Sequence, residues 1–426
     1  MKAIIFFASL LARAATKPAE SFVSYYGHKV FRVPVMDDGT HIQSLVDRLN
    51  LHVWQPPSKK GAFADVQVSP SQLEVFRKAM HGRSFEILHE DLGVSIAREG
   101  AAVHTYTVPC GRRAVGSANA SWFTSYHPYN DHLQWMEDIA SQYSSNAKIV
   151  TSGATGDGGN ITGLHIFGRN GGGKKPAVVF HGTVHAREWI VAMTLEFIIH
   201  ELVAKYSSDA AVRAVVDKYD FYVFPIVNVD GFKYTQTTDR MWRKNRSRNQ
   251  GSSCLGTDVN RNWPYKWNGP GSSKNPCSET YRGAVAGNSP EVKSYMAFLD
   301  KVKKSQGLKL YIDWHSYSQL FMTPYGHSCS ARAPNHTGLQ ALAKGASEAM
   351  RRVHGTSFAY GPVCDTIYQV AGASIDWVQD VLNADNVFTI ELRDRGRYGF
   401  VLPPHQIIPS GEESFAGAMH LFQNMG

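Results

Sequence analysis

The sequence predicts an α/β protein in which a mixed, mostly parallel twisted sheet is covered by helices on both faces, preceded by a small α+β domain. The composition, 43% hydrophobic and 19% charged over 426 residues, provides enough apolar material for a large core and excludes a disordered chain. In the longer C-terminal part, apolar strands alternate with helical patterns. Uninterrupted apolar strands of this kind indicate a sheet that is buried on both faces.

The elements of the C-terminal part follow from the spacing of its apolar residues. Short runs rich in β-branched and aromatic residues predict strands at 177–182, 221–229, 308–314 and 386–392. Apolar residues spaced three and four apart predict helices at 190–205, 338–354, 374–382 and 411–424. In sheets of this class the chemistry is held at the strand ends.

Residues 16 to about 100 predict the smaller α+β domain. Residues 28–35 (HKVFRVPV) alternate like a half-buried strand, and residues 40–51 carry apolar side chains at helical spacing. A second strand is expected at 64–68 and a second helix at 71–81. This part contains no cluster of chemically useful residues.

The first 15 residues predict a secretory signal peptide. Lys2 precedes an apolar run of about ten residues that ends in small residues, and a run of that length is too short to span a bilayer. We therefore expect a secreted, extracellular protein. Farther on, Arg112 and Arg113 precede a stretch of small residues, a pattern typical of a protease-accessible link. Cleavage after Arg113 would separate residues 16–113 from residues 114–426, with Arg98 as an alternative or additional site.

The charges and cysteines exclude several classes of function. The net charge of +8 is shared equally by the parts before and after Arg113, so we expect neither nucleic acid nor membrane as a partner. A monomer is the default expectation. None of the five cysteines has a C-x-x-C spacing, which argues against a thiolate zinc site or a redox dithiol. In an exported protein the cysteines would pair and leave one over.

The sharpest chemical feature is the pair His185 and Glu188, directly after a predicted strand. Imidazole and carboxylate are zinc ligands, and a His-x-x-Glu turn can direct both at one ion, although a salt-bridged surface turn gives the same pattern. His315, at the end of another strand, would complete a three-ligand set with the fourth position open to water. His181 competes for this role, but its place inside a strand favours a packed or hydrogen-bonded core histidine.

A hydrolytic site also needs a base and a fixed cation. Glu391 ends an apolar strand, where a carboxylate is costly unless it is used or paired, and the alternative to catalysis is an ion pair with Arg393 or Arg395. A cation that stabilises developing negative charge can come from residues 240–246 (RMWRKNR), whose alternative is a solvated basic loop.

The C-terminal part contains six motifs in this order: HAREW, MWRKNRS, DVNRNW, DWHSYSQ, TIYQ followed by GASIDW, and TIELRDRGRYGF. From about Ser121 to the C-terminus, their order and approximate spacing resemble the zinc metallocarboxypeptidases of the pancreatic carboxypeptidase A type. More loosely, HKVFRVPV and FADVQV resemble the activation segment of that family. The resemblance implies the zinc carboxypeptidase fold, with residues 16–113 as a propeptide domain and connecting segment that make the full chain a zymogen, and residues 114–426 as the catalytic domain.

Carboxypeptidase A is itself a standard example of a catalytic zinc held by two histidines and a glutamate, so the ligand set is implied by the resemblance. The resemblance thus implies that His185, Glu188 and His315 bind one Zn²⁺. Glu391 would take a proton from the attacking water and pass it to the leaving amine, and Arg243 would stabilise the oxyanion. Asp258 would hold the first zinc histidine in its tautomer.

The resemblance also implies how a substrate would bind. Asn260 and Arg261 would grip the free C-terminal carboxylate, since the guanidinium fork matches a carboxylate. Tyr368 would close over the bound residue, and Arg187 would add a further contact. The expected activity is hydrolysis of the C-terminal peptide bond of peptides and proteins, after activation by a trypsin-like or dibasic-specific protease.

The side-chain pocket decides which C-terminal residue is removed. Ile375 lies where family members that remove Lys or Arg carry an aspartate, and an apolar base cannot pair a buried ammonium. We therefore expect a preference for aromatic or aliphatic C-terminal residues. Asp365 lies three residues before Tyr368 on a pocket-forming stretch, and it leaves mixed or basic specificity as an alternative.

The resemblance pairs Cys254 with Cys277 and Cys329 with Cys364, which leaves Cys110 over. Three other classes compete with the carboxypeptidase. A zinc amidase acting on small acylated amino acids would have little need of the carboxylate clamp together with Tyr368. A zinc-bearing binding protein would be expected to lack Glu391 or Arg243. A serine hydrolase would need a G-x-S-x-G motif, which does not occur in the chain.

Overall fold

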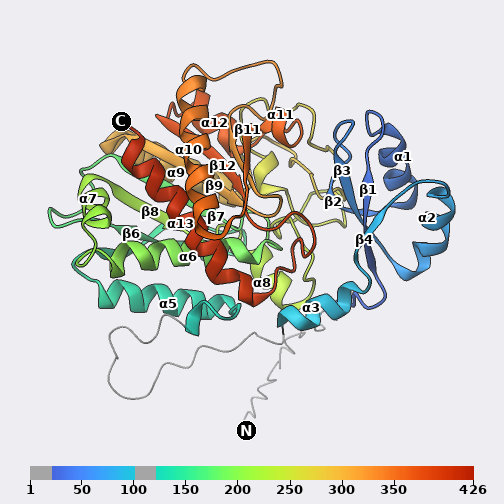
Figure 1. Cartoon of the computed structure of the whole chain (residues 1–426), viewed down its shortest axis with the longest axis horizontal. Coiled ribbons are helices and arrows are strands. Elements are labelled where there is room, and N and C mark those ends of the chain that lie inside the picture. The colour runs from blue at the N-terminus through green and yellow to red at the C-terminus, as the bar shows by residue number, and fades with distance from the viewer. Residues whose placement is uncertain (1–21, 101–120) are drawn as a thin grey trace, which may run out of the picture.

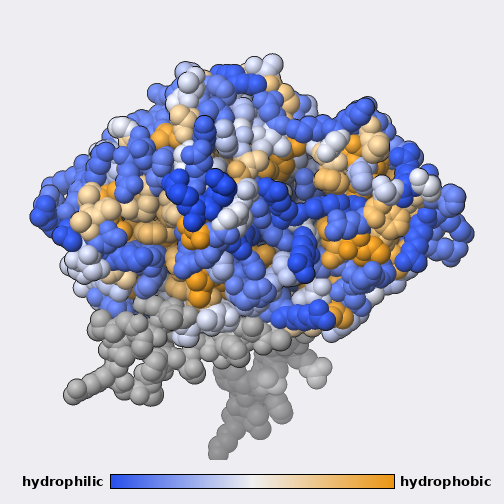
Figure 2. Space-filling view, viewed as in Figure 1, coloured by the Kyte–Doolittle hydropathy of each residue, from blue (hydrophilic) through white to orange (hydrophobic). Residues whose placement is uncertain are grey.

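The structure is a computed structural model that describes residues 22–100 and 121–426. The predicted signal peptide, Cys110 and the predicted cleavage site at Arg113 lie outside the described residues. Among the described helices, none combines the length and the apolar character that crossing a membrane requires. On the face shown in Figure 2, hydrophobic residues form scattered patches among hydrophilic ones.

The C-terminal domain (residues 121–426) is built on an eight-stranded mixed sheet, which confirms the predicted fold class. The four central strands run parallel, whereas the other strands include antiparallel pairings. In spatial order the strands are β11 (Ala359–Pro362), β10 (Leu320–Thr323), β12 (Asn386–Glu391), β9 (Leu308–His315), β7 (Ala177–Gly182), β8 (Asp220–Phe224), β6 (Asn160–Ile166) and β5 (Ala147–Ala154).

Helices cover both faces of this sheet (Figure 1). Because side chains alternate along a strand, Val178 and Phe180 of β7 join one core cluster, while Ala177 and Val179 join the other. The first cluster packs against α5 (Tyr129–Gln142), α6 (Trp189–Ala204), α7 (Ala210–Lys218), α10 (His336–His354) and α13 (Ile407–Asn424). The second packs against α9 (Pro290–Gln306) and α12 (Ser374–Asp380).

One predicted element is wrong in part. The sequence predicts a single strand over 221–229, but β8 ends at Phe224 and the chain enters helix α8 (Val229–Thr237). Pro225 has no N–H to continue the ladder, and the side chain of Asn228 caps the helix by accepting a hydrogen bond from the Gly231 N–H at 3.0 Å. Residues 225–228 therefore form a turn in place of the second half of the predicted strand, and α8 begins at residue 229.

The N-terminal domain (residues 22–100) is the predicted α+β unit with a core of its own. Its antiparallel sheet has the order β2 (His52–Gln55), β3 (Phe63–Val68), β1 (Lys29–Pro34) and β4 (Glu86–His89). The helices are α1 (Thr40–Leu49), α2 (Leu73–Ala79) and α3 (Leu92–Gly100). In Figure 1 the sheet lies between α1 and α2 on one side and the C-terminal domain on the other.

Buried charges join the two domains. Asp65 of β3 forms an ion pair with Arg32 at 2.6 Å and accepts a hydrogen bond from the Tyr317 hydroxyl at 2.6 Å. At the end of α3, Glu99 forms an ion pair with Arg240 at 2.7 Å, and each of the two side chains is only 1% exposed. A charge buried this deeply depends on its partner.

Glu99→Gln should lower the free energy of unfolding of the full chain by about 3–5 kcal/mol, because it leaves the Arg240 guanidinium buried without a counter-charge. Chemical denaturation of the uncleaved protein measures this change. The control is Glu74→Gln, which breaks the exposed pair between Glu74 and Lys78 on α2 and should have little effect. An equal loss in both variants would contradict the role of the buried pair.

Candidate active site

Three potential metal ligands converge where two parallel strands end. His185 and Glu188 lie in the turn between β7 and α6, and His315 is the last residue of β9, the strand that pairs with β7. All three are buried. The His185 Nδ1 lies 2.8 Å from Glu188 Oε1, and the His315 Nδ1 lies 3.1 Å from His185 Nδ1 and 3.2 Å from Glu188 Oε2.

The spacing of these atoms fits a tetrahedral zinc ion. Two ligand atoms about 2.1 Å from such an ion lie roughly 3.4 Å apart, and the separations of 3.1 and 3.2 Å from His315 Nδ1 are close to this value, whereas the 2.8 Å between His185 and Glu188 is shorter. Two imidazole nitrogens and a carboxylate are also the donor set of catalytic zinc. Within residues 22–100 and 121–426, this is the one group of three such side chains found close enough to hold a metal ion.

A carboxylate lies behind each histidine of the cluster. Asp258 Oδ1 lies 3.3 Å from His185 Nε2, and Asp258 Oδ2 accepts from the Arg243 guanidinium at 2.9 Å. Asp313 Oδ1 lies 2.9 Å from His315 Nε2. Sequence reasoning missed Asp313, although its position two residues before His315 on a strand places both side chains on one face.

Glu391 lies beside the cluster at the end of β12, in register with His315. Its Oε2 is buried without a hydrogen-bond partner, and it lines a cavity together with His185, Glu188 and Arg243. Burial raises the pKa of Glu391 to about 8. A cation bound next to it would favour the carboxylate and lower this pKa again.

The sequence-based alternative for Glu391, an ion pair with a nearby arginine, is not what the structure contains. Arg393 pairs with Glu413 of α13 at 2.5 Å instead. Arg395 donates to the backbone carbonyl of Ser357 at 3.0 Å. Glu391 is therefore left without an ion-pair partner among the described residues.

Asn260 and Arg261 lie in a short 3-10 turn (Val259–Arg261) that Asp258 begins, because its side chain accepts from the Asn260 N–H at 2.9 Å. The buried Arg261 guanidinium donates to two backbone carbonyls, of Gly271 and of Asn260. In the described part of the chain it has no carboxylate partner. Its charge thus remains available to an anion in the cavity that it lines.

Beyond Arg261 the cavity becomes apolar. Tyr368 is half-buried at its edge, and Ile375, at the start of α12, is 2% exposed. The other apolar lining residues are Met322, Val363, Ile367, Val370 and Ala373. The lining contains no acidic side chain other than Glu391, which lies beside the metal-ligand cluster.

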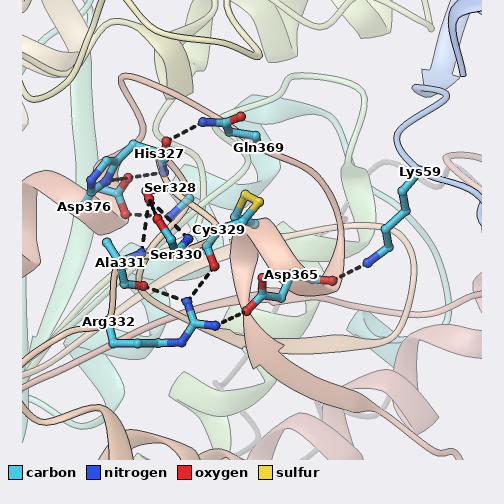
Figure 3. The surroundings of a disulfide bond; sticks show 12 residues. Lys59, His327, Ser328, Cys329, Ser330, Ala331, Arg332, Asp365, Gln369 and Asp376 are labelled. Carbon is cyan, nitrogen blue, oxygen red and sulfur yellow. Dashed lines mark hydrogen bonds and ion pairs between the residues drawn. A yellow bond between two sulfur atoms is a disulfide. The ribbon is translucent and has the colours of Figure 1, made fainter. Parts of the chain in front are cut away.

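Asp365 does not line this cavity. Its carboxylate pairs with Arg332 at 2.8 Å, and its backbone carbonyl accepts a hydrogen bond from Lys59 of the N-terminal domain (Figure 3). The disulfide between Cys329 and Cys364 lies next to it. Both disulfides that the resemblance implies are present, since Cys254 and Cys277 are also joined.

The N-terminal domain covers the metal-ligand cluster. Trp54 and Gln55 of β2 line the same cavity as His185 and Glu391, and this cavity measures only about 30 Å³. That space holds a water molecule or two but excludes a peptide. Trp54 packs against Phe400 of the C-terminal domain, with ring centres 5.1 Å apart.

Arg187 lies at the edge of the covered cleft. Its guanidinium donates to both carboxylate oxygens of Glu279 at 3.2 Å and to the Val53 carbonyl of β2 at 3.5 Å. It also lies over the Phe400 ring at 4.2 Å. The guanidinium thus contacts a peptide carbonyl of the N-terminal domain.

Comparison with known proteins identifies both domains. Residues 132–417 match the zinc carboxypeptidase family, and residues 37–99 match the carboxypeptidase activation peptide. A metallocarboxypeptidase A-like protein of Trichophyton verrucosum is 49% identical over an alignment of 430 residues that covers 100% of both chains. A metallocarboxypeptidase A of Trichophyton equinum is 44% identical over 424 residues, 99% of each chain. The crystal structure of thrombin activatable fibrinolysis inhibitor has a TM-score of 0.84 and 28% identity, covering 94% of this chain and 99% of that one.

The chain therefore belongs to the zinc carboxypeptidase family. It is a carboxypeptidase A-like metallocarboxypeptidase of the zymogen type, with an N-terminal activation peptide and one catalytic zinc. These matches confirm the predicted enzyme class and cofactor.

Proposed function

We propose that this protein is a secreted exopeptidase that removes aromatic or aliphatic residues from the C-terminus of peptides and proteins. The observation that carries the proposal is the convergence of His185, Glu188 and His315 beside the unpartnered carboxylate of Glu391, with an apolar cavity next to them. The proposed metal ligands are these two histidines and Glu188. A zinc ion held by these residues would supply Lewis acidity for the scissile carbonyl and for the attacking water.

The remaining chemistry belongs to side chains of the C-terminal domain. Glu391 takes the proton of the attacking water and delivers it to the leaving amine. Arg243, held by Asp258, stabilises the negative charge that develops on the carbonyl oxygen. Because Asp258 also lies next to His185, it connects the Arg243 guanidinium to the metal-ligand cluster.

Recognition of the substrate's C-terminal carboxylate rests on Arg261 and Asn260, which line the cavity next to its apolar residues. A guanidinium without a carboxylate partner favours a substrate that brings its own, which an internal peptide bond or an amidated end does not. The same clamp argues against a zinc amidase for small acylated amino acids. Tyr368 closes the cavity, and Arg187 contacts the peptide upstream.

The uncleaved chain is proposed to be latent, because Trp54 and Gln55 occupy the approach to the metal ligands. Cleavage after Arg113 by a trypsin-like or dibasic-specific protease would release residues 16–113 and open the cleft. The enzyme is proposed to act outside the cell, since its signal-like N-terminal segment and two disulfides fit an oxidising compartment. A monomer is the proposed oligomeric state.

The proposal is tested by comparing the full-length protein before and after trypsin treatment on blocked dipeptides ending in Phe, Leu, Arg or amidated Phe. We expect release of free Phe and Leu only after cleavage, and its loss with a chelator, because the cut uncovers a zinc site. Preferred release of Arg would overturn the apolar specificity. Absence of release from every free carboxylate would overturn the exopeptidase and favour the amidase or the binding protein.

Glu391→Gln should lower kcat of the activated enzyme by about 10²- to 10⁴-fold, the usual contribution of a general base, without loss of zinc. Metal analysis alongside turnover of the Phe dipeptide measures both properties. The matched variant His315→Ala should lose zinc and activity together. Normal turnover by Glu391→Gln would show that another group is the base.

Ile375→Asp should raise kcat/KM for peptides ending in Arg relative to those ending in Phe by roughly 10-fold or more, since it places a carboxylate in the apolar cavity. The control is Val381→Asp at the exposed end of α12, where the ratio should not change. An unchanged ratio in a folded Ile375→Asp variant would place the specificity pocket elsewhere.

A further inference from the structure

A third histidine lies close to the metal-ligand cluster but outside it. His181 is in β7, four residues before His185, and its imidazole is buried among side chains of the sheet. Its Nε2 lies 2.9 Å from Asp313 Oδ1 and 2.7 Å from the Tyr311 hydroxyl. His181 is therefore not one of the converging ligands.

Asp313 connects this histidine to the cluster. Its Oδ1 lies 2.9 Å from His181 Nε2 on one side and 2.9 Å from His315 Nε2 on the other. Its Oδ2 accepts a hydrogen bond from the Ser374 hydroxyl at the start of α12. The carboxylate is 1% exposed, so its charge depends on these neighbours.

Strand pairing fixes this geometry. Asp313 of β9 stands opposite His181 of β7 in the parallel register, and His315 lies two residues farther along the same strand. Asp313 and His315 therefore share one face of the sheet. The backbone sets the three side chains in a row, with the carboxylate in the middle.

A carboxylate facing one imidazole nitrogen favours the tautomer in which that nitrogen carries the proton. The other nitrogen is then free to bind metal. In His315 the nitrogen facing Asp313 is Nε2, while Nδ1 faces His185 and Glu188. The side-chain amide nitrogen of Asn260 also lies 3.1 Å from this Nε2, so the Asp313 carboxylate and the Asn260 amide lie next to the same ring nitrogen. The distance of 2.9 Å from Asp313 Oδ1 is the contact on which the tautomer depends.

We propose that Asp313 is a positioning residue that holds His315 with its Nδ1 directed at the metal, and that His181 and Ser374 hold Asp313 in turn. This inference rests on the proposed function, since it assumes that His315 is a ligand. It assigns His181 a role in shaping the metal site without contact with the ion.

The test is the zinc affinity of the activated enzyme, measured by competition with a chelator of known affinity. Asp313→Asn should weaken zinc binding by about 10- to 100-fold, the usual effect of losing such a partner. At saturating zinc, kcat should fall while KM for the Phe dipeptide stays close to that of the wild type, because the substrate clamp is intact.

His181 supplies a rescue experiment that a purely structural role would not reproduce. His181→Leu should weaken zinc binding, because it removes the partner of Asp313. His181→Gln should restore much of the affinity, since its side-chain amide can donate to the carboxylate. Ser374→Ala removes a single hydrogen bond and provides a milder variant if Asp313→Asn fails to fold.

The matched control is Asp220→Asn, which disrupts another buried pair, between Asp220 and His165 at 3.2 Å on β8 and β6. It should leave zinc affinity unchanged. Wild-type zinc affinity in a folded Asp313→Asn or Ser374→Ala variant would overturn the inference, and so would an equal loss in Asp220→Asn. Failure of the wild-type enzyme to bind zinc would instead overturn the proposed function.

Discussion

Parallel pairing of β7, β9 and β12 is the constraint on which the rest of the structure depends. It brings the carboxyl ends of three strands to one edge of the sheet, and His185, His315 and Glu391 lie at or just beyond these ends. Helices pack against both faces of the sheet behind this edge. A metal ion and a water need such fixed donors, since ligand atoms must sit within a few tenths of an ångström of their places.

This arrangement buries several charged side chains, and two of the carboxylates lie next to polar or oppositely charged partners. Asp258 is shared between His185 and Arg243, and Asp313 is shared between His315 and His181. Each carboxylate thus lies between a proposed ligand histidine and a second polar group. The metal cluster is thus supported by a layer of polar side chains that do not contact the ion.

The N-terminal domain covers the cleft in which a substrate is proposed to bind. Its strand β2 presents a peptide carbonyl to Arg187 and places Trp54 against Phe400, above the metal ligands. The buried pair of Glu99 and Arg240 holds the last helix of this domain to the C-terminal domain, directly before the segment in which cleavage is proposed. Docking and latency therefore follow from the same contacts.

The sequence by itself determined the alternation of strands and helices and the two-part organisation, because apolar periodicity is a local property. The order of its motifs, through the family resemblance, also indicated the three residues that are proposed as metal ligands. Sequence reasoning misjudged the strand after Phe224, where Pro225 and the Asn228 cap ended the ladder. Only the tertiary structure decided that Asp365 faces Arg332 rather than the pocket and that Asp313 joins His181 to His315. Those partners depend on strand register and on packing between segments far apart in the chain, which local spacing does not encode.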